Sequence, residues 1–227
     1  MATATFCRRP PMDTPLRFFP LDRIEELEAE IAAGLRTGSL WDRRDAIAVA
    51  LGLHGLRIGE VCNARADDFR PEHRRLFVRT LKGGRTRDLT LHDSVVAALI
   101  QWRARVITRL DRRPVWLLCS QRGNHLSPQR PQQCAWAIFR RLLGPRHQLT
   151  FHSLRHTFGM WLYRETHDVI LVKAKLGHAS VQTTEEYYVK NLSDVPEQCQ
   201  VRLNGKLLPA PREVPGCQLR LFNPTAG

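Results

Sequence analysis

The sequence has none of the cysteine patterns or long apolar runs that indicate a metal-binding, disulfide-bonded or membrane-spanning protein. It contains no CxxC pair and no group of cysteine and histidine at zinc-finger spacing. No apolar run approaches the roughly 20 residues that cross a bilayer, and the N-terminus lacks the apolar core of a secretory signal. We therefore predict free thiols, no metal ion and a cytoplasmic location. The six cysteines are Cys7, Cys62, Cys119, Cys134, Cys199 and Cys217.

Acidic residues are also scarce relative to basic ones. The chain has 22 Asp and Glu against 35 Lys and Arg, a formal net charge of +13, and its pI is near 10.4. A field of this sign attracts polyanions, so nucleic acid is the leading class of partner. Charge alone also permits a basic membrane-surface protein or a ribosome-associated protein, so the motifs have to decide.

Hydrophobic periodicity predicts an α+β fold that is mainly helical, with one small antiparallel β-hairpin. Apolar residues three or four positions apart indicate helices over about 21–38, 42–53, 95–106, 134–142, 153–164 and 168–176. The stretches LFVRT (76–80) and RDLTL (87–91) alternate apolar and polar residues on either side of KGGRT, which is typical of a hairpin. Asp168 is expected to cap the last helix, which should end at Gly177. The residues expected to point inward from 153–164 are Leu154, Phe158, Trp161 and Leu162.

Proline marks both ends of the chain. Residues 1–20 contain four prolines and little periodicity, which indicates an extended basic arm. Residues 21–190 carry the helical and hairpin patterns and form the predicted folded domain. The tail, 191–227, has five prolines and only weak strand-like pieces, so its order is expected to depend on a partner.

Cleavage of a DNA strand without a metal ion needs four kinds of group. These are a nucleophile for phosphorus, cations for the non-bridging oxygens, an acid for the leaving 5′ oxygen and a base for the attacking hydroxyl. The chain has a candidate for each. In order they are Arg57 in HGLRIGEV, Lys82 in LKGG, His152 and Arg155 in FHSLRHTFG, His178 in LGHAS, and Tyr187 in TTEEYYVK.

This order and spacing resemble the catalytic domain of the tyrosine recombinase, or phage integrase, family over about residues 21–190. The stretches HSLRHTF and LGHASVQTTEEYY carry the resemblance, with Tyr187 nine residues after His178. The resemblance implies the catalytic-domain fold of that family and a site-specific recombinase that joins DNA to tyrosine through a 3′-phosphotyrosine link. It also implies that no ATP, metal ion or other cofactor is needed.

The resemblance assigns a role to each candidate. The planar guanidinium groups of Arg57 and Arg155 would each hold two phosphate oxygens and stabilise the transition state. Lys82 would donate a proton to the 5′ oxygen, and His152 would accept one from the nucleophile. His178 would add a hydrogen bond to a phosphate oxygen.

Tyr187 is the predicted nucleophile, and Tyr188 is the alternative. A phenol with a pKa near ~10 needs a local base and nearby positive charge to attack phosphorus, and the two arginines supply that charge. Two adjacent tyrosines are by default core or interface aromatics. The preceding LGHASVQTT favours the catalytic interpretation.

Two features lie beside the predicted catalytic residues. Glu60, three residues after Arg57, either orients that guanidinium or faces solvent. His152 and His156 lie four apart on one predicted helix, but no acidic residue follows His152 and no third ligand is evident, so zinc is not expected.

Only 56 residues precede Arg57. The resemblance therefore extends to a short form of the family, similar to the fimbrial phase-variation invertases, without the separate helical domain that clamps DNA in many members. Binding would then depend on the basic arm, protomer contacts or accessory DNA-bending proteins. The expected partners are double-stranded DNA carrying specific recombination sites and four copies of the chain on two sites, with a monomer or dimer when free and no membrane. The tail at 191–227 is expected to dock on a neighbouring protomer.

Three competing functions are weaker. A type IB topoisomerase shares the chemistry, but HSLRHTF and LGHAS disfavour it. A non-cleaving DNA-binding accessory protein of the same fold would be free to lose Arg57, Lys82, Arg155 or Tyr187, and all four are present. A basic ribosomal or RNA-binding module would form no covalent adduct with DNA.

Overall fold

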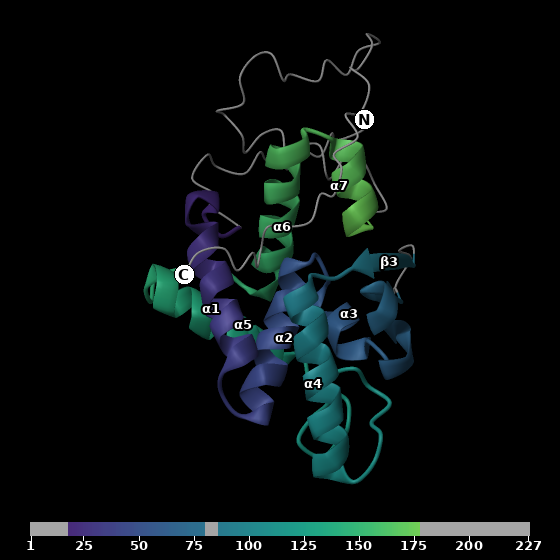
Figure 1. The fold of residues 1–227 in the computed structure, drawn as a ribbon. Coiled ribbons are helices and arrows are strands. Elements are labelled where there is room, and N and C mark those ends of the chain that lie inside the picture. Colours follow the sequence, from purple (N-terminus) through teal and green to yellow (C-terminus); the bar gives the residue numbers. More distant parts are fainter. Residues whose placement is uncertain (1–17, 80–85, 178–227) are drawn as a thin grey trace, which may run out of the picture.

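A computed structural model of the chain describes residues 18–79 and 86–177 (Figure 1). Within these ranges the fold is mainly helical with one small antiparallel sheet, which confirms the predicted fold class. The α-helices are α1 (Ile24–Arg36), α2 (Leu40–Leu53), α3 (Ile58–Asn63), α4 (Asp93–Leu110), α5 (Gln129–Leu143), α6 (Phe151–Thr166) and α7 (Val169–Leu176). The strands are β1 (Phe69–Arg70), β2 (Arg75–Val78) and β3 (Arg87–Thr90), and short 3-10 turns span Leu21–Arg23, Ala66–Asp68 and Pro71–His73.

Helix α2 runs through the centre of the helical bundle. It packs against α1, α4, α5 and α6, and every residue from Arg43 to Leu53 is buried. A helix with buried residues on every side is one that neighbouring helices surround. Its start is fixed by a capping box, in which the Asp42 backbone N–H donates to Ser39 Oγ at 3.3 Å and the Ser39 N–H donates to the Asp42 carboxylate at 3.0 Å.

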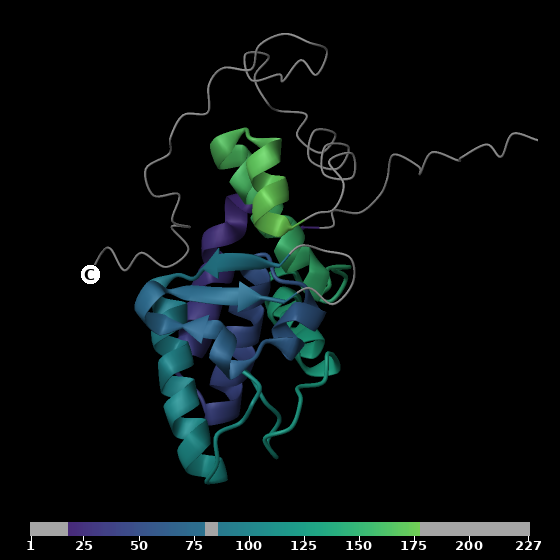
Figure 2. The ribbon, with the colours of Figure 1, turned by 90° about the vertical axis from the view of Figure 1, so that its right-hand side faces the viewer.

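The sheet lies against one face of the bundle (Figure 2). Strands β2 and β3 form the predicted hairpin, with Arg75 paired to Thr90 and Val78 paired to Arg87. The two-residue strand β1 adds a third strand beside β2 that the sequence pattern did not predict. The hairpin turn at 80–85, which contains Lys82, lies outside the described residues.

Helices α6 and α7 extend from the bundle and enclose a second, smaller apolar cluster (Figure 1). Leu154, Phe158 and Leu162 are buried as expected, whereas Trp161 is only partly buried at the edge of this cluster. Asp168 caps α7 by accepting the Leu171 N–H at 2.9 Å, which confirms the predicted cap.

The bundle extends into the segment that the sequence assigned to the N-terminal arm. Phe18 and Phe19 are buried, and the Phe19 ring stacks on Phe139 with 6.0 Å between ring centroids. The Phe19 N–H also donates to Thr157 Oγ1 at 2.8 Å. Aromatic burial therefore anchors the described chain to α5 and α6 from its first residues onward. No helix in the described part of the chain is long and apolar enough to cross a membrane.

Candidate active site

The turn between α2 and α3 places Arg57 at the surface and Glu60 behind it. Gly55 has a φ of +89°, and a Cβ at this position would lie 2.8 Å from Phe158 Cδ1, so the turn requires glycine. Arg57 directly precedes α3, and its backbone N–H donates to Glu60 Oε2 at 2.9 Å. The Arg57 side chain, 38% exposed, also donates from Nη1 to Glu60 Oε1 at 3.0 Å. Glu60 therefore orients Arg57, which decides between the two interpretations left open by the sequence.

Glu60 is the centre of a cluster of three arginines. Its side chain is 2% exposed. Arg87 donates from Nη1 to Oε1 at 3.1 Å and from Nη2 to Oε2 at 2.9 Å, and Arg155 Nη1 lies 3.9 Å from Oε2. Burial alone would raise the pKa of the Glu60 carboxyl, but hydrogen bonds from Arg87 and the Arg57 backbone and the charges of Arg87 and Arg155 bring that pKa below its ordinary value. Glu60 is therefore ionised at neutral pH.

Arg155 lies inside the protein, in contrast to Arg57. It comes from the second turn of α6, is 1% exposed, and donates to the backbone carbonyls of Gly55 and Leu176. The first carbonyl belongs to the α2–α3 turn and the second to the end of α7. Arg155 thus joins these two segments inside the protein.

His152 lies one helical turn before Arg155, on the exposed side of α6. Its ring meets the His156 ring edge-on, with 4.4 Å between ring centroids. Although the residue reaches solvent, partial loss of hydration at the ring and the charges of Arg155 and Arg57 hold the pKa of His152 below its ordinary value. The imidazole is therefore neutral at pH 7 and able to accept a proton. The described residues contain no group of three His, Cys, Asp or Glu placed to hold a metal ion.

Three of the six predicted residues, Lys82, His178 and Tyr187, fall outside the described residues, as does the alternative nucleophile Tyr188. The described residues nevertheless end near the arginine cluster in two segments, the one that precedes Lys82 and the one that precedes His178. Val78 pairs with Arg87, and this is the pair of the hairpin nearest to its turn. At the end of α7, a Cβ on Gly177 would lie 3.1 Å from Arg87 Nη1.

Arg87 was missed by the sequence analysis. It begins β3, and strand alternation places it on the same face as Leu89, which is buried. An arginine on the core-facing side of a strand needs a buried acid as its partner. The alternation of Arg87 with Leu89 and Leu91 was therefore the signal that could have identified it.

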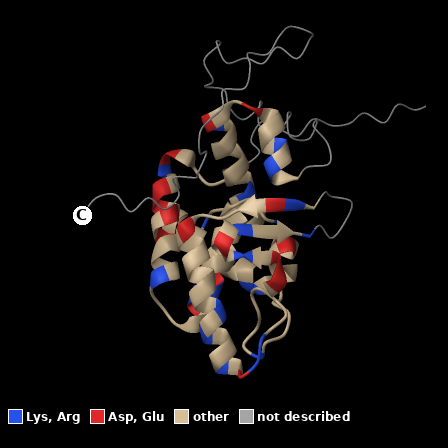
Figure 3. Cartoon of the chain, turned by 45° about the vertical axis from the view of Figure 1, so that its right-hand side comes forward, with Lys and Arg blue, Asp and Glu red and all other residues tan. Residues whose placement is uncertain are grey.

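The electrostatic character of this region follows from the cluster. One carboxylate and three guanidinium groups give these four side chains a net formal charge of +2. Lys173 and Lys175 occupy the last turn of α7 nearby, and Figure 3 shows basic residues at that end of α7 and at the hairpin end of β3. Taken together, these groups favour an anion at this surface.

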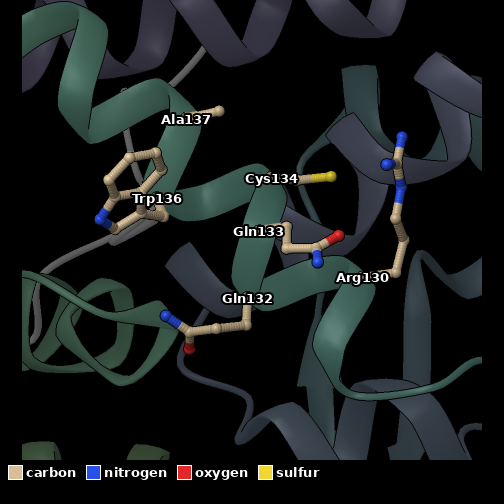
Figure 4. Close-up of a pocket in the computed structure, with 6 residues that line it drawn as sticks. All are labelled: Arg130, Gln132, Gln133, Cys134, Trp136 and Ala137. Carbon is tan, nitrogen blue, oxygen red and sulfur yellow. The ribbon is translucent and has the colours of Figure 1, made fainter.

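A separate hollow of about 540 Å³ lies on α5 and contains none of the predicted site residues. All six side chains that line it come from this one helix (Figure 4). They are Arg130, Gln132, Gln133, Cys134, Trp136 and Ala137. We find no grouping of acid, base and nucleophile there, so the candidate active site is the arginine cluster.

Known proteins that are similar to this chain are tyrosine recombinases. The sequence profile described as "Phage integrase family" matches residues 19–193. The tyrosine recombinase XerA of Pyrococcus furiosus is 30% identical over 158 residues, which cover 66% of this chain and 52% of that protein. The tyrosine recombinase XerD of Mycobacterium tuberculosis is 32% identical over 191 residues, which cover 79% of this chain and 59% of that protein. The chain thus spans little more than half the length of these relatives.

A solved structure has the same fold. The XerH site-specific recombinase bound to its difH substrate superposes with a TM-score of 0.67 at 21% identity, covering 83% of this chain and 53% of that one.

Proposed function

Because the chain belongs to the phage integrase family, we propose that it is a site-specific recombinase that cleaves and rejoins DNA strands through a 3′-phosphotyrosine intermediate. The observation that carries the proposal is the arginine cluster, in which three guanidinium groups converge on one buried carboxylate and leave net positive charge. A phosphodiester suits this arrangement, because guanidinium groups fixed in advance stabilise the charge that develops at phosphorus.

Tyr187 is the nucleophile in the proposed reaction. Its hydroxyl oxygen bonds to phosphorus while the bond from phosphorus to the 5′ oxygen breaks, so one phosphate ester replaces another and no cofactor is consumed. His152 accepts the phenol proton, in keeping with its neutral state. Lys82 donates a proton to the leaving 5′ oxygen, and His178 adds a hydrogen bond to a non-bridging oxygen. Attack by the 5′ hydroxyl of another strand reverses these steps and rejoins the DNA.

The two arginines enter this reaction differently. Arg57 is partly exposed and is already oriented by Glu60, so it meets the phosphate directly. Arg155 is enclosed by the carbonyls of Gly55 and Leu176. Because Arg155 is only 1% exposed, its direct contact with phosphate requires that the residues covering it move aside.

The proposed partner is double-stranded DNA carrying recombination sites, in keeping with the net charge of +13. Strand exchange takes place between two DNA sites that four copies of the chain bind. In each copy the segment 191–227 docks on a neighbouring copy. Accessory DNA-bending proteins, an N-terminal arm that ends before the buried Phe18, a free monomer or dimer and a location on the bacterial nucleoid belong to the same proposal.

Covalent capture tests the function. The protein is mixed with nicked suicide duplexes that tile its own replicon, denatured, and assayed for protein-linked DNA. In these duplexes the cleaved fragment diffuses away, so the adduct accumulates. We expect an adduct with the wild type that Tyr187→Phe abolishes, because phenylalanine has no oxygen to bond to phosphorus.

Tyr188→Phe is the matched control and is expected to retain the adduct. An adduct that persists in Tyr187→Phe and disappears in Tyr188→Phe moves the nucleophile by one position. Duplex binding without any adduct from the wild type contradicts the proposal and favours a non-cleaving DNA-binding protein.

A further inference from the structure

We propose that Arg87 is a positioning residue for DNA cleavage, which fixes the Glu60 carboxylate and the Gly55 carbonyl and, through them, Arg57 and Arg155. The inference rests on the proposed recombinase function. It adds a residue that lies outside the six predicted ones and that does not itself touch the reacting atoms.

The first support is the geometry of the Arg87–Glu60 pair. The two terminal nitrogens of Arg87 each donate to a different oxygen of Glu60, at 3.1 and 2.9 Å. Such a paired contact holds the plane of the carboxylate as well as its position. The same two oxygens receive the Arg57 side chain and backbone at 3.0 and 2.9 Å. A rotation of Glu60 would therefore displace Arg57.

The second support is a shared carbonyl. Arg87 Nη2 lies 3.5 Å from the Gly55 oxygen, which is also the acceptor for Arg155. Arg87 and Arg155 thus converge on both Gly55 and Glu60. Loss of Arg87 would change the acceptors of both other arginines at once.

The third support is that Arg87 is poorly explained as a purely stabilising residue. Its side chain is 10% exposed, and its Nε lacks a hydrogen-bond partner among the described residues. A buried donor without a partner costs about 1–3 kcal/mol. A buried ion pair is often no more stable than well-packed apolar residues. The observed contacts favour orientation over stability.

The position of Arg87 also connects three segments. It pairs with Val78 next to the hairpin turn. Its side chain contacts Gly55 and Glu60 in the α2–α3 turn and packs against Gly177 at the end of α7. The predicted residues Lys82 and His178 follow from two of these segments in the sequence. Arg87 therefore contacts the described segments that lead, in the sequence, to the proposed acid and to one of the proposed phosphate ligands.

The test compares Arg87→Gln and Arg87→Lys with a matched control, Arg79→Gln. Arg79 belongs to the same hairpin and forms a two-point pair with the buried Asp68, at 2.8 and 2.7 Å, but is 54% exposed and has no contact with Glu60. For each full-length variant we measure the single-turnover rate constant for covalent adduct formation, the DNA concentration for half-maximal rate, and the melting temperature. Assays are run well below the lowest melting temperature.

We expect Arg87→Gln to lower the rate constant at saturating DNA by about 30-fold or more, the scale of losing part of a preorganised charge site. The half-saturating DNA concentration should change by less than about 3-fold, because a positioning residue affects the transition state more than the bound ground state. Arg87→Lys should recover part of the rate, since it restores the charge without the two-point contact. Arg79→Gln should react at the wild-type rate.

Three results overturn the inference. In the first, Arg87→Gln reacts like the wild type. In the second, Arg87→Gln and Arg79→Gln slow the reaction equally. In the third, the loss lies entirely in DNA affinity. Each of these requires an adduct from the wild type, so each is distinguishable from failure of the proposed function, in which the wild type itself forms no adduct.

Discussion

Two buried carboxylates, Asp45 and Glu60, each bind more than one arginine, yet the two clusters are built differently. Asp45 lies within α2, and its Oδ1 accepts from the adjacent Arg44 at 2.9 Å while its Oδ2 accepts from Arg130 Nε at 2.8 Å. Arg44 also donates to the Cys119 carbonyl at 3.2 Å. The Asp45 cluster thus joins α2 to the first turn of α5 and to the loop before it.

The Glu60 cluster draws its arginines from α6, β3 and the residue before α3, and carries a larger excess of charge. Two arginines face one carboxylate at Asp45, and one of them, Arg130, is 47% exposed and well screened by water. Three arginines face Glu60, and two of them are largely buried. Positive charge that is buried and only partly compensated is costly. Asp45 therefore holds helices together, whereas the excess positive charge around Glu60 favours an anion.

Glu60→Gln is expected to have the largest effect of any change in either cluster. It keeps the size of the side chain but removes the negative charge that the three arginines share, so their guanidinium groups repel one another. We expect the rate constant for adduct formation to fall by about 100-fold or more, and the free energy of unfolding to fall by about 3–5 kcal/mol. Single-turnover kinetics and denaturant titration measure the two effects separately.

Asp45→Asn is the matched control for that prediction. It should also destabilise the protein by about 3 kcal/mol, since it leaves the buried Arg44 without an ionised partner. Below its melting temperature, however, it should form the adduct at the wild-type rate. Equal loss of rate in the folded Asp45→Asn and Glu60→Gln variants would show that the two clusters are equivalent.

Among the described residues, the sequence predicted six of the seven α-helices and the hairpin, because their apolar residues recur at regular spacing. It did not predict α3, whose six residues are too few to show a helical period. It missed β1, which is only two residues long and leaves no alternation to recognise. It placed Phe18 and Phe19 in a proline-rich arm, because local composition does not reveal the long-range contacts that bury them. Phe19 stacks on Phe139 of α5, and Phe18 packs in the apolar cluster of α6 and α7. Element type is a local property in these cases, whereas burial depends on the partner.

The sequence also predicted only part of the candidate site. Arg57 and Arg155 were identifiable from motif order, but the order says nothing about their different depth. Periodicity would have helped, because Arg155 shares a helical face with Phe158 and Leu162, which are buried. The relation of Arg87 to Glu60 joins residues 27 positions apart in two different elements. It became visible only once the hairpin was packed on the α2–α3 turn.

Acid should destabilise the Glu60 side of the molecule before the Asp45 side. His54, next to Gly55, is buried, and its Nδ1 contacts the Ala50 carbonyl at 2.8 Å while its Nε2 accepts the His92 N–H at 3.3 Å. Burial lowers the pKa of His54 from 6.5 to about 4. Between these values the unfolded chain binds a proton that the folded chain excludes. Stability from this group is therefore complete above pH 6.5 and falls by about 3 kcal/mol as the pH drops to 4.

Denaturant titration of the wild type and His54→Gln at pH 7 and pH 4.5 measures this contribution. The Glu28 carboxyl, whose pKa burial raises to about 7, acts in the opposite direction over the same range. The relevant quantity is therefore the difference between the two proteins. The variant should lose less stability than the wild type on acidification. Equal losses of stability in the two proteins would show that the proton is taken up by another group. Hydrogen exchange at acid pH should show that the backbone opens at Gly55 before it opens at Asp45.

Arg130→Gln is expected to have the smallest effect of these substitutions, and its counterpart in the Glu60 cluster is Arg87→Gln. Both substitutions remove a two-point contact to a buried carboxylate, but Arg130 is 47% exposed whereas Arg87 is 10% exposed. Arg44 remains as a partner for Asp45, so the free energy of unfolding should fall by about 1 kcal/mol or less. Denaturant midpoints of the two variants should differ, with Arg87→Gln the less stable. The opposite order would mean that screening by water does not explain the difference in stability between the two clusters.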